Sequence, residues 1–113
     1  MTACNRGDVV LVAFVFSDDS GRKLRPAVVI SAAARHGVRR EAVVAAITSN
    51  VGRRLLGDHL MISEWRGAGL LFPSAVTGII RTINHTMIER KLGSLGTADM
   101  EAVERELRRS LGL

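Results

Sequence analysis

The sequence predicts a small, mainly β fold, an SH3-like barrel with one helix at its C-terminus. Short runs of apolar and β-branched residues alternate with polar or glycine-containing segments, and only the last part of the chain has the periodicity of an amphipathic helix. The chain has 113 residues, enough for one hydrophobic core and too few for two. We therefore expect a single domain over residues 1–113.

Several segments have the composition of strands. The run DVVLVAFVF is rich in β-branched and aromatic residues and suits a strand that is covered on both faces. The runs RPAVVIS and EAVVAAIT have the same buried character. The expected strands are residues 8–16, 25–31, 41–48, 58–63 and 75–83. Residues 87–91 fit either one turn of helix or an edge strand.

Arg25 and Pro26 are expected at the start of the second strand. The preceding residues, 17–24, are polar and turn-forming. Proline has no N–H to donate to a neighbouring strand and is tolerated at a strand's first residue. This places Arg25 at the rim of the sheet, where its side chain can face a groove.

The C-terminal helix is expected to begin at Thr97 as its N-cap, with acidic residues in the first turn and Arg108 and Arg109 in the last. Both ends suit the helix dipole. Spacings of three and four create an apolar stripe that should pack on the sheet, formed by Met100, Val103, Leu107 and Leu111. Two ion pairs are expected on the opposite face: Glu101 with Arg105, and Glu104 with Arg108.

Positive charge is concentrated in the middle of the chain. The net charge is +5, and the segment from Ser20 to Arg66 alone holds nine basic and three acidic side chains. Such a field attracts polyanions, and nucleic acid above all. The alternative is an arginine-rich solvated surface.

The N-terminus carries no apolar segment of a signal peptide, and no stretch of the chain is apolar for long enough to cross a bilayer. A cytoplasmic location is expected. Cys4 is the only cysteine, which rules out an intrachain disulfide and a thiolate zinc cluster. We expect Cys4 to lie in a frayed terminus without a role.

The usual catalytic motifs are absent, and the three histidines, His36, His59 and His85, are far apart in the sequence. A metalloenzyme is therefore not expected. A lone histidine is more often a surface or packing residue than a catalytic base. His59 is the favoured candidate of the three for a catalytic role. The few aromatic residues do not suffice for the stacking platforms of RNA-recognition domains. Trp65 suits the anchoring of a turn or a subunit contact at least as well as base stacking.

The remaining candidates are polar residues that follow apolar strands: Arg25, and Thr48 with its successors Ser49 and Asn50. Here the chain resembles a known family. GDVVLVAFVFSDDSGRKLRPAVVIS (7–31) resembles the opening of the MazF/PemK/Kid-type toxins. AAITSN (45–50) looks like their third strand, and residues 69–113 are similar to their C-terminal half. The resemblance covers nearly the whole chain.

The resemblance implies a homodimer that cleaves single-stranded RNA, such as mRNA, at short motifs by metal-independent attack of the 2′-hydroxyl. It implies a cognate antitoxin whose disordered tail occupies the RNA groove, and no cofactor. The implied catalytic pair is Arg25 and Thr48. The implied RNA-binding residues are Phe16, Ser17, Arg22, Lys23, Ser49, Asn50, Arg53 and Arg54. Departures from the family pattern are Ala13 and Val15 in place of prolines and Phe72 in place of a lysine.

Arginine stays protonated at neutral pH and is a poor general base, so the proton of the 2′-hydroxyl would go to a group of lowered pKa or to solvent. Two other functions remain open. One is a protein-binding toxin like the CcdB-type gyrase poison, and the other is a non-catalytic RNA-binding module. Arg25 would then form a surface ion pair, with Asp18 or Asp19, and Thr48 would merely favour the strand.

Overall fold

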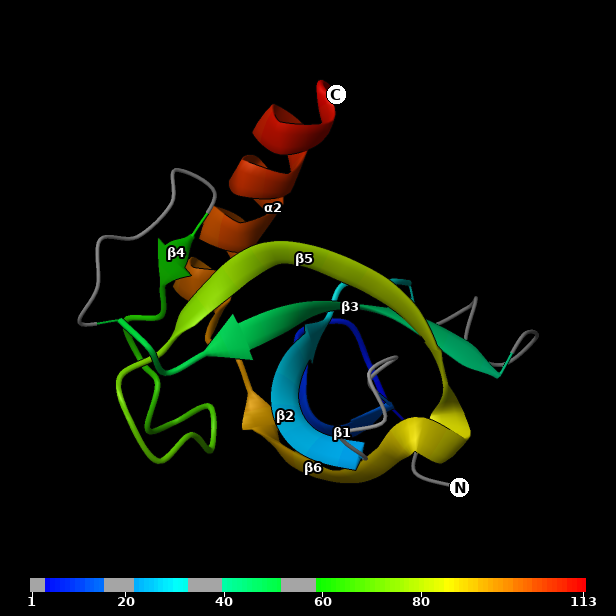
Figure 1. Cartoon of the computed structure of the whole chain (residues 1–113). Coiled ribbons are helices and arrows are strands. Elements are labelled where there is room, and N and C mark those ends of the chain that lie inside the picture. Colours follow the sequence, from blue (N-terminus) through cyan, green and yellow to red (C-terminus); the bar gives the residue numbers. More distant parts are fainter. Residues whose placement is uncertain (1–3, 16–21, 33–39, 52–58) are drawn as a thin grey trace.

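Six antiparallel strands and a C-terminal helix make up the part of the chain that the computed structural model describes, residues 4–15, 22–32, 40–51 and 59–113 (Figure 1). The elements are β1 (Asp8–Val15), β2 (Arg22–Val29), β3 (Glu41–Thr48), β4 (Leu60–Met61), β5 (Ala75–Asn84), the 3₁₀ turn η1 (His85–Met87), β6 (Ile88–Ser94) and α2 (Thr97–Leu111).

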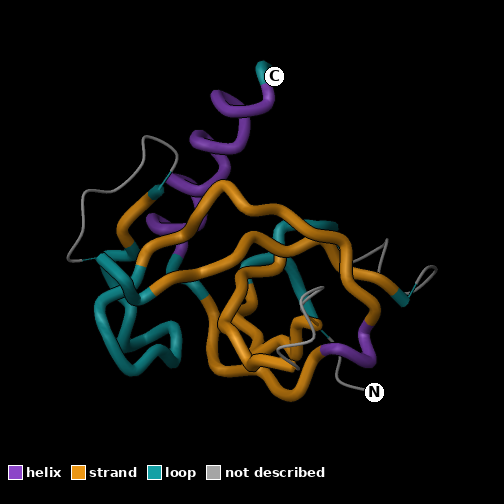
Figure 2. Tube along the Cα trace, viewed as in Figure 1, coloured by secondary structure: helices purple, strands orange, loops and turns teal. Residues whose placement is uncertain are grey.

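The strand order, β4-β5-β3-β2-β1-β6, explains the curl of the sheet. β5 and β6 lie at opposite sides of this order, yet only the three residues of η1 join them. So short a connection requires the sheet to roll until β5 and β6 approach each other. Figure 2 shows the strands curling around a common centre, with α2 outside. The predicted small barrel of the SH3-like type is confirmed in outline, although the sheet of the described residues stays open between β4 and β6.

Both faces of the sheet are covered, as the continuous apolar runs of the strands predict. The outer face packs against α2 and the segment between β4 and β5, through a cluster that includes Val9, Val28 and Val103. The inner face encloses a second cluster, which includes Val10, Val12 and Val44. Successive strand residues therefore contribute to opposite clusters.

Cys4 belongs to the inner cluster and is 5% exposed, so the expectation of a frayed terminus at this residue was wrong. Its Sγ lies 3.9 Å from Nε2 of His85, which is itself buried. Burial, and second the charge of Asp8, raise the pKa of the Cys4 thiol. The thiol is thus a packing group rather than a nucleophile.

β2 begins at Arg22, and Pro26 lies inside the strand opposite Leu11, so the predicted strand start was wrong. The reason is that β2 has two neighbours of different length. It pairs with β1 from Arg22 to Val28, but with β3 only from Ala27 to Val29. The hydrogen-bonded pairing of β2 with β3 ends at Ala27, next to Pro26, which has no N–H to donate. Arg25 accordingly lies where β2 is paired on one side only.

Other boundaries also differ from the prediction. The strand expected over residues 58–63 contracts to Leu60–Met61. The two alternatives for residues 87–91 both occur, because a helical turn ends at Met87 and the edge strand β6 follows it. β3 has the predicted bounds, and β5 extends one residue further than expected. None of the described helices is long and apolar enough to cross a membrane.

Gly96, not Thr97, is the N-cap of α2, because its carbonyl accepts the first helical hydrogen bond from the N–H of Met100 at 2.9 Å. The apolar stripe packs on the core only in its first part: Val103 is 2% exposed and Leu111 58%. Glu104, expected to pair with Arg108, forms an ion pair with Arg6 at 3.1 Å.

Asp99 ties the first turn of α2 to the segment after β4. Its carboxylate is buried and accepts hydrogen bonds from the backbone N–H groups of Ser63 and Glu64, both at 3.0 Å. The position near the helix N-terminus also favours a negative charge. The Asp99 side chain therefore joins α2 to the segment between β4 and β5, and both pack on the outer face of the sheet.

We predict that Asp99→Ala lowers the free energy of unfolding by about 1–3 kcal/mol, because it removes the acceptor of two backbone donors. Asp99→Asn should cost less, since one oxygen acceptor remains. Urea unfolding measures both, with Glu101→Ala, an exposed carboxylate of the same helix, as the control. Equal losses in Asp99→Ala and Glu101→Ala would contradict the role given to Asp99.

Candidate functional site

A pocket of about 530 Å³ opens between β1, β2, β3 and β5. Two arginines line it, and no carboxylate is among its described lining residues. The lining consists of Phe14, Arg25, Pro26, Ala46, Ile47, Thr48, Ser49, Asn50, Thr77, Ile79 and Arg81. A pocket of this composition favours an anionic ligand with apolar, flat parts.

The pocket is the open end of the barrel interior. Along β1, Phe14 follows the inner-cluster residues Val10 and Val12 at every second position. The same alternation places Arg25 two residues from the buried Ala27, and Thr48 in step with Val44. Arg25 and Thr48 therefore project from the inner face of the sheet, where the apolar cluster ends.

A bulge in β5 shapes one wall of the pocket. Ala45 pairs with Ile80 and Ile47 pairs with Val76, so that Thr77, Gly78 and Ile79 lie opposite the single residue Ala46. The buried Thr77 hydroxyl donates to the carbonyl of Ala46 at 2.8 Å and accepts from the N–H of Ile79 at 3.1 Å. One side chain thus replaces the ladder bonds that the bulge interrupts.

Thr48 ends β3 and folds the chain back at the pocket. Its Oγ1 accepts a hydrogen bond from the N–H of Asn50 at 3.1 Å, and the N–H of Val51 donates to the carbonyl of Ser49 at 2.9 Å. These bonds form a tight turn of the kind that threonine hydroxyls stabilise. The turn keeps Thr48, Ser49 and Asn50 together on the lining.

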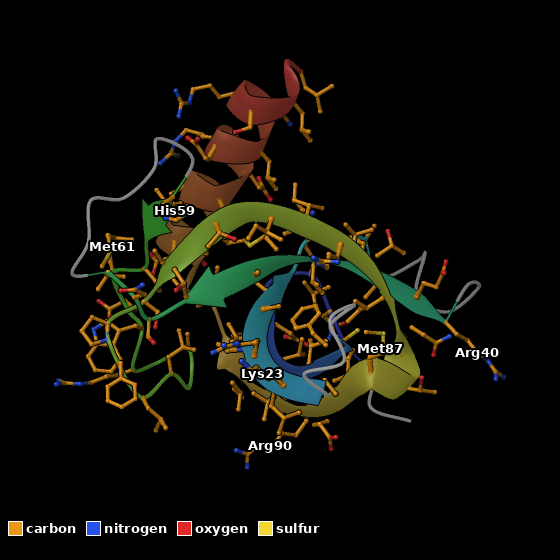
Figure 3. All side chains as sticks on the ribbon, viewed as in Figure 1. Lys23, Arg40, His59, Met61, Met87 and Arg90 are labelled. Atoms are coloured by element: carbon orange, nitrogen blue, oxygen red, sulfur yellow. The ribbon has the colours of Figure 1, made fainter. Side chains whose placement is uncertain are left out.

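The structure brings together four of the residues that the sequence nominated: Arg25, Thr48, Ser49 and Asn50. Lys23 is an exposed residue of β2, in step with Arg25 but outside the described lining (Figure 3). Arg22 begins β2, and its side chain is not described. Phe16, Ser17, Arg53 and Arg54 lie outside the described residues, as do Asp18, Asp19 and His36.

Sequence reasoning missed Phe14, Thr77, Ile79 and Arg81 as lining residues. Phe14 has no signal of its own, because it continues the apolar alternation of β1. Arg81 did have a signal in the sequence, because an arginine inside an otherwise apolar strand indicates that the strand is exposed at that position.

The described histidines lie elsewhere. His85 packs beside Cys4 in the inner cluster, and His59 lies half-buried beside β4 (Figure 3). Neither is among the lining residues of the pocket. Within the described part of the chain, no three His, Cys, Asp or Glu side chains gather as they would around a metal ion.

The fold and the pocket define a class of protein, a curled antiparallel sheet with a C-terminal helix and a basic, hydroxyl-lined pocket at the open end of its interior. Comparison with known proteins identifies the family. The model of the PemK-like, MazF-like toxins of type II toxin–antitoxin systems matches residues 5–111, and the chain belongs to this family. No curated protein matches the sequence significantly.

Solved structures share the fold at low sequence identity. A mycobacterial endoribonuclease in complex with its cognate antitoxin is 21% identical, with a TM-score of 0.75 over 100% of this chain and 97% of that one. MazF from Deinococcus radiodurans is 17% identical, with a TM-score of 0.79 over 100% of both chains. A MazE–MazF complex from the same organism is 20% identical, with a TM-score of 0.77 over 100% of this chain and 99% of that one.

We predict that Thr77→Val lowers the free energy of unfolding by about 1–3 kcal/mol, because it leaves a buried carbonyl and a backbone N–H without their shared hydroxyl. Thr77→Ser should retain most of the stability. Thermal unfolding would test this against Thr82→Val, which alters an exposed threonine of the same strand. A Thr77→Val protein as stable as Thr82→Val would show that the hydroxyl does not hold the bulge.

Proposed function

We propose that this protein is a toxin endoribonuclease that cleaves single-stranded RNA at short sequence motifs without a metal ion, and that it acts in the cytoplasm. The observation that carries the proposal is the meeting of Arg25 and Thr48, from two different strands, in one pocket that has no described carboxylate. Family membership and the endoribonucleases among the structural relatives support it.

The proposed reaction is an attack of a ribose 2′-oxygen on the adjacent phosphorus. The O2′–P bond forms and the P–O5′ bond breaks, which leaves a 2′,3′-cyclic phosphate and a 5′-hydroxyl. The 2′-hydroxyl proton passes to solvent, and the departing 5′-oxygen takes up a proton. The transition state is a phosphorane that carries more negative charge than the starting diester, so donors that bind this charge accelerate the reaction.

Arg25 and Thr48 supply such donors. A guanidinium presents two parallel N–H groups that match two phosphoryl oxygens. The Thr48 oxygen already accepts the N–H of Asn50, which leaves its hydroxyl hydrogen as the group to donate to the phosphate. Ser49 and Asn50 offer further polar groups to the nucleotides beside the cleaved bond.

We predict that Arg25→Ala lowers kcat about 10²–10³-fold, the usual effect of losing one preorganised donor to a transition-state anion, or ~3–4 kcal/mol. Its free energy of unfolding should change by about 1 kcal/mol or less, because Arg25 is exposed. Arg25→Lys should recover little. Thr48→Ala should lose less activity than Arg25→Ala, and Thr48→Ser should lose little.

The assay incubates purified protein with a long single-stranded RNA in EDTA and maps the fragment ends, which should carry 5′-hydroxyl groups. Arg90→Ala is the matched control, because Arg90 is an exposed arginine of β6 that points away from the barrel (Figure 3). Activity that needs magnesium would refute the metal-independent mechanism. Wild-type protein that binds RNA without cutting it would favour the binding module.

We predict that RNA and an acidic, initially disordered antitoxin segment compete for the basic groove, with Arg25 at its centre. The sequence nominates Arg22, Lys23, Arg53 and Arg54 as further basic residues for this binding. Any polyanion would gain binding free energy from neutralising these basic side chains. A labelled 2′-O-methyl RNA, which lacks the nucleophile, should be displaced by the cognate antitoxin. A stable ternary complex of toxin, RNA and antitoxin would exclude a shared site.

We propose a homodimer that forms through the apolar groove beside α2. The groove, of about 820 Å³, lies between α2 and the sheet and is bordered by Ile80, Leu111 and Leu113. Leu113 is 84% exposed and Leu111 58%, an exposure that a second copy would remove. Leu70 is buried in the core and is therefore not available for this contact.

Light scattering should therefore give twice the chain mass of 12.2 kDa. The double variant Leu111→Glu, Leu113→Glu should shift the protein to monomers, because charges would be buried in the contact. Leu71→Glu is the control, since Leu71 is 82% exposed and lies outside the groove. A wild-type protein that is monomeric at micromolar concentration, or a Leu71→Glu effect of the same size, would contradict this assignment.

A further inference from the structure

Phe14 and Arg81 face each other across the pocket, from β1 and β5. The guanidinium carbon of Arg81 lies 6.0 Å from the centre of the Phe14 ring. Elsewhere in the molecule, Arg66 stacks over Trp65 at 4.8 Å. The Phe14–Arg81 pair is thus more open than the direct stack that this same chain forms at another place.

This separation is about 1 Å less than a third planar group between the two side chains would need. Atoms in van der Waals contact lie about 3.5–4 Å apart, so a flat ring held between two planes needs them about 7 Å apart. A movement of the guanidinium by roughly 1 Å would provide this space. Arg81 can move, because it belongs to the exposed stretch of β5 that follows the bulge, while Phe14 is half-buried and packs against the inner cluster. Phe14 is thus the fixed wall and Arg81 the adjustable one.

The gap also lies beside the proposed catalytic pair. Val12 pairs with Arg25 across β1 and β2, and Phe14 follows Val12 by two residues on the same face. Such diagonal neighbours have Cα atoms about 7–8 Å apart. A nucleotide next to the phosphate at Arg25 can therefore extend its base toward Phe14. Single-stranded RNA is commonly bound in this way, with bases unstacked onto aromatic rings and arginine planes.

We propose that the Phe14 ring and the Arg81 guanidinium hold one nucleobase of the RNA between them, next to the bond that Arg25 and Thr48 cleave. This inference rests on the proposed ribonuclease activity. It assigns Phe14 and Arg81 a role in binding, in contrast to the transition-state role of Arg25. Loss of either side of the sandwich should accordingly raise KM and leave kcat nearly unchanged.

The test first maps the cleavage motif of the wild-type protein and then uses a short RNA that contains one such site. Arg81→Ala and Phe14→Leu should each raise KM about ten-fold, with kcat within about three-fold of wild type. Arg81→Lys should resemble Arg81→Ala, because an ammonium has the charge but not the plane. Arg90→Ala, the control for the loss of one positive charge, should leave KM within about two-fold of wild type.

A second measurement identifies the base. RNAs in which one nucleotide near the cut is abasic are compared with the intact RNA, for wild type and for Arg81→Ala. At one position the missing base should cost wild type about ten-fold in kcat/KM and cost Arg81→Ala clearly less, because the variant has already lost one of the two contacts to that base. Melting curves ensure that Phe14→Leu is compared as a folded protein.

Equal losses in wild type and Arg81→Ala at every abasic position would overturn the sandwich. A fall in kcat alone for Arg81→Ala would also overturn it and would place Arg81 in the chemical step. If the wild-type protein cleaves no RNA, the proposed function itself fails, which is a different outcome from normal cleavage that is insensitive to Arg81 and Phe14.

Discussion

The short connection between β5 and β6 is the constraint from which the architecture follows. These strands lie on opposite sides of the sheet order, and three residues join them. The sheet must therefore curl, and its two faces become different environments. Because side chains alternate between the faces, the inner residues of each strand converge on one axis. At one end they form the apolar cluster around Val12 and Val44, and at the other they form the pocket.

On the outer face of the sheet, the segment between β4 and β5 is fixed by close contact between backbone atoms. The segment between β4 and β5 touches β6 so closely that a Cβ on Gly69 would overlap the carbonyl oxygen of Leu92. Gly69 also has a φ of +83°, which favours glycine. Together with the Asp99 bonds to Ser63 and Glu64, this contact fixes the cover of the outer cluster. The strands that carry the pocket are thereby supported from behind.

The pocket keeps Arg25 and Arg81 on one lining in which no described carboxylate balances them. Two like charges in a partly enclosed space raise the energy of the empty site, and a bound anion relieves this repulsion. Other exposed arginines of the same protein do have acidic partners: Arg6 binds Glu104, and Arg109 binds Glu106. The pocket thus differs from the rest of the basic surface in how its charge is arranged, not only in how much it has.

The strands, the C-terminal helix and the nomination of Arg25 and Thr48 could be read from the sequence, because local periodicity and a family pattern both lie in neighbouring residues. Bounds such as Glu41–Thr48 could be predicted, since the apolar run and the polar residues after it mark the strand directly.

Contacts between residues that are distant in the chain became known from the fold alone. The burial of Cys4, the bond of Glu104 to Arg6, and the bulge of β5 around Thr77 each depend on segments that are far apart in the chain. The same holds for Phe14 and Arg81, which share the pocket because the sheet curls and β5 bulges, and not because of any pattern near either residue. Strand periodicity predicts the face of the sheet on which a side chain lies, but the curl of the whole sheet determines which other side chains it meets there.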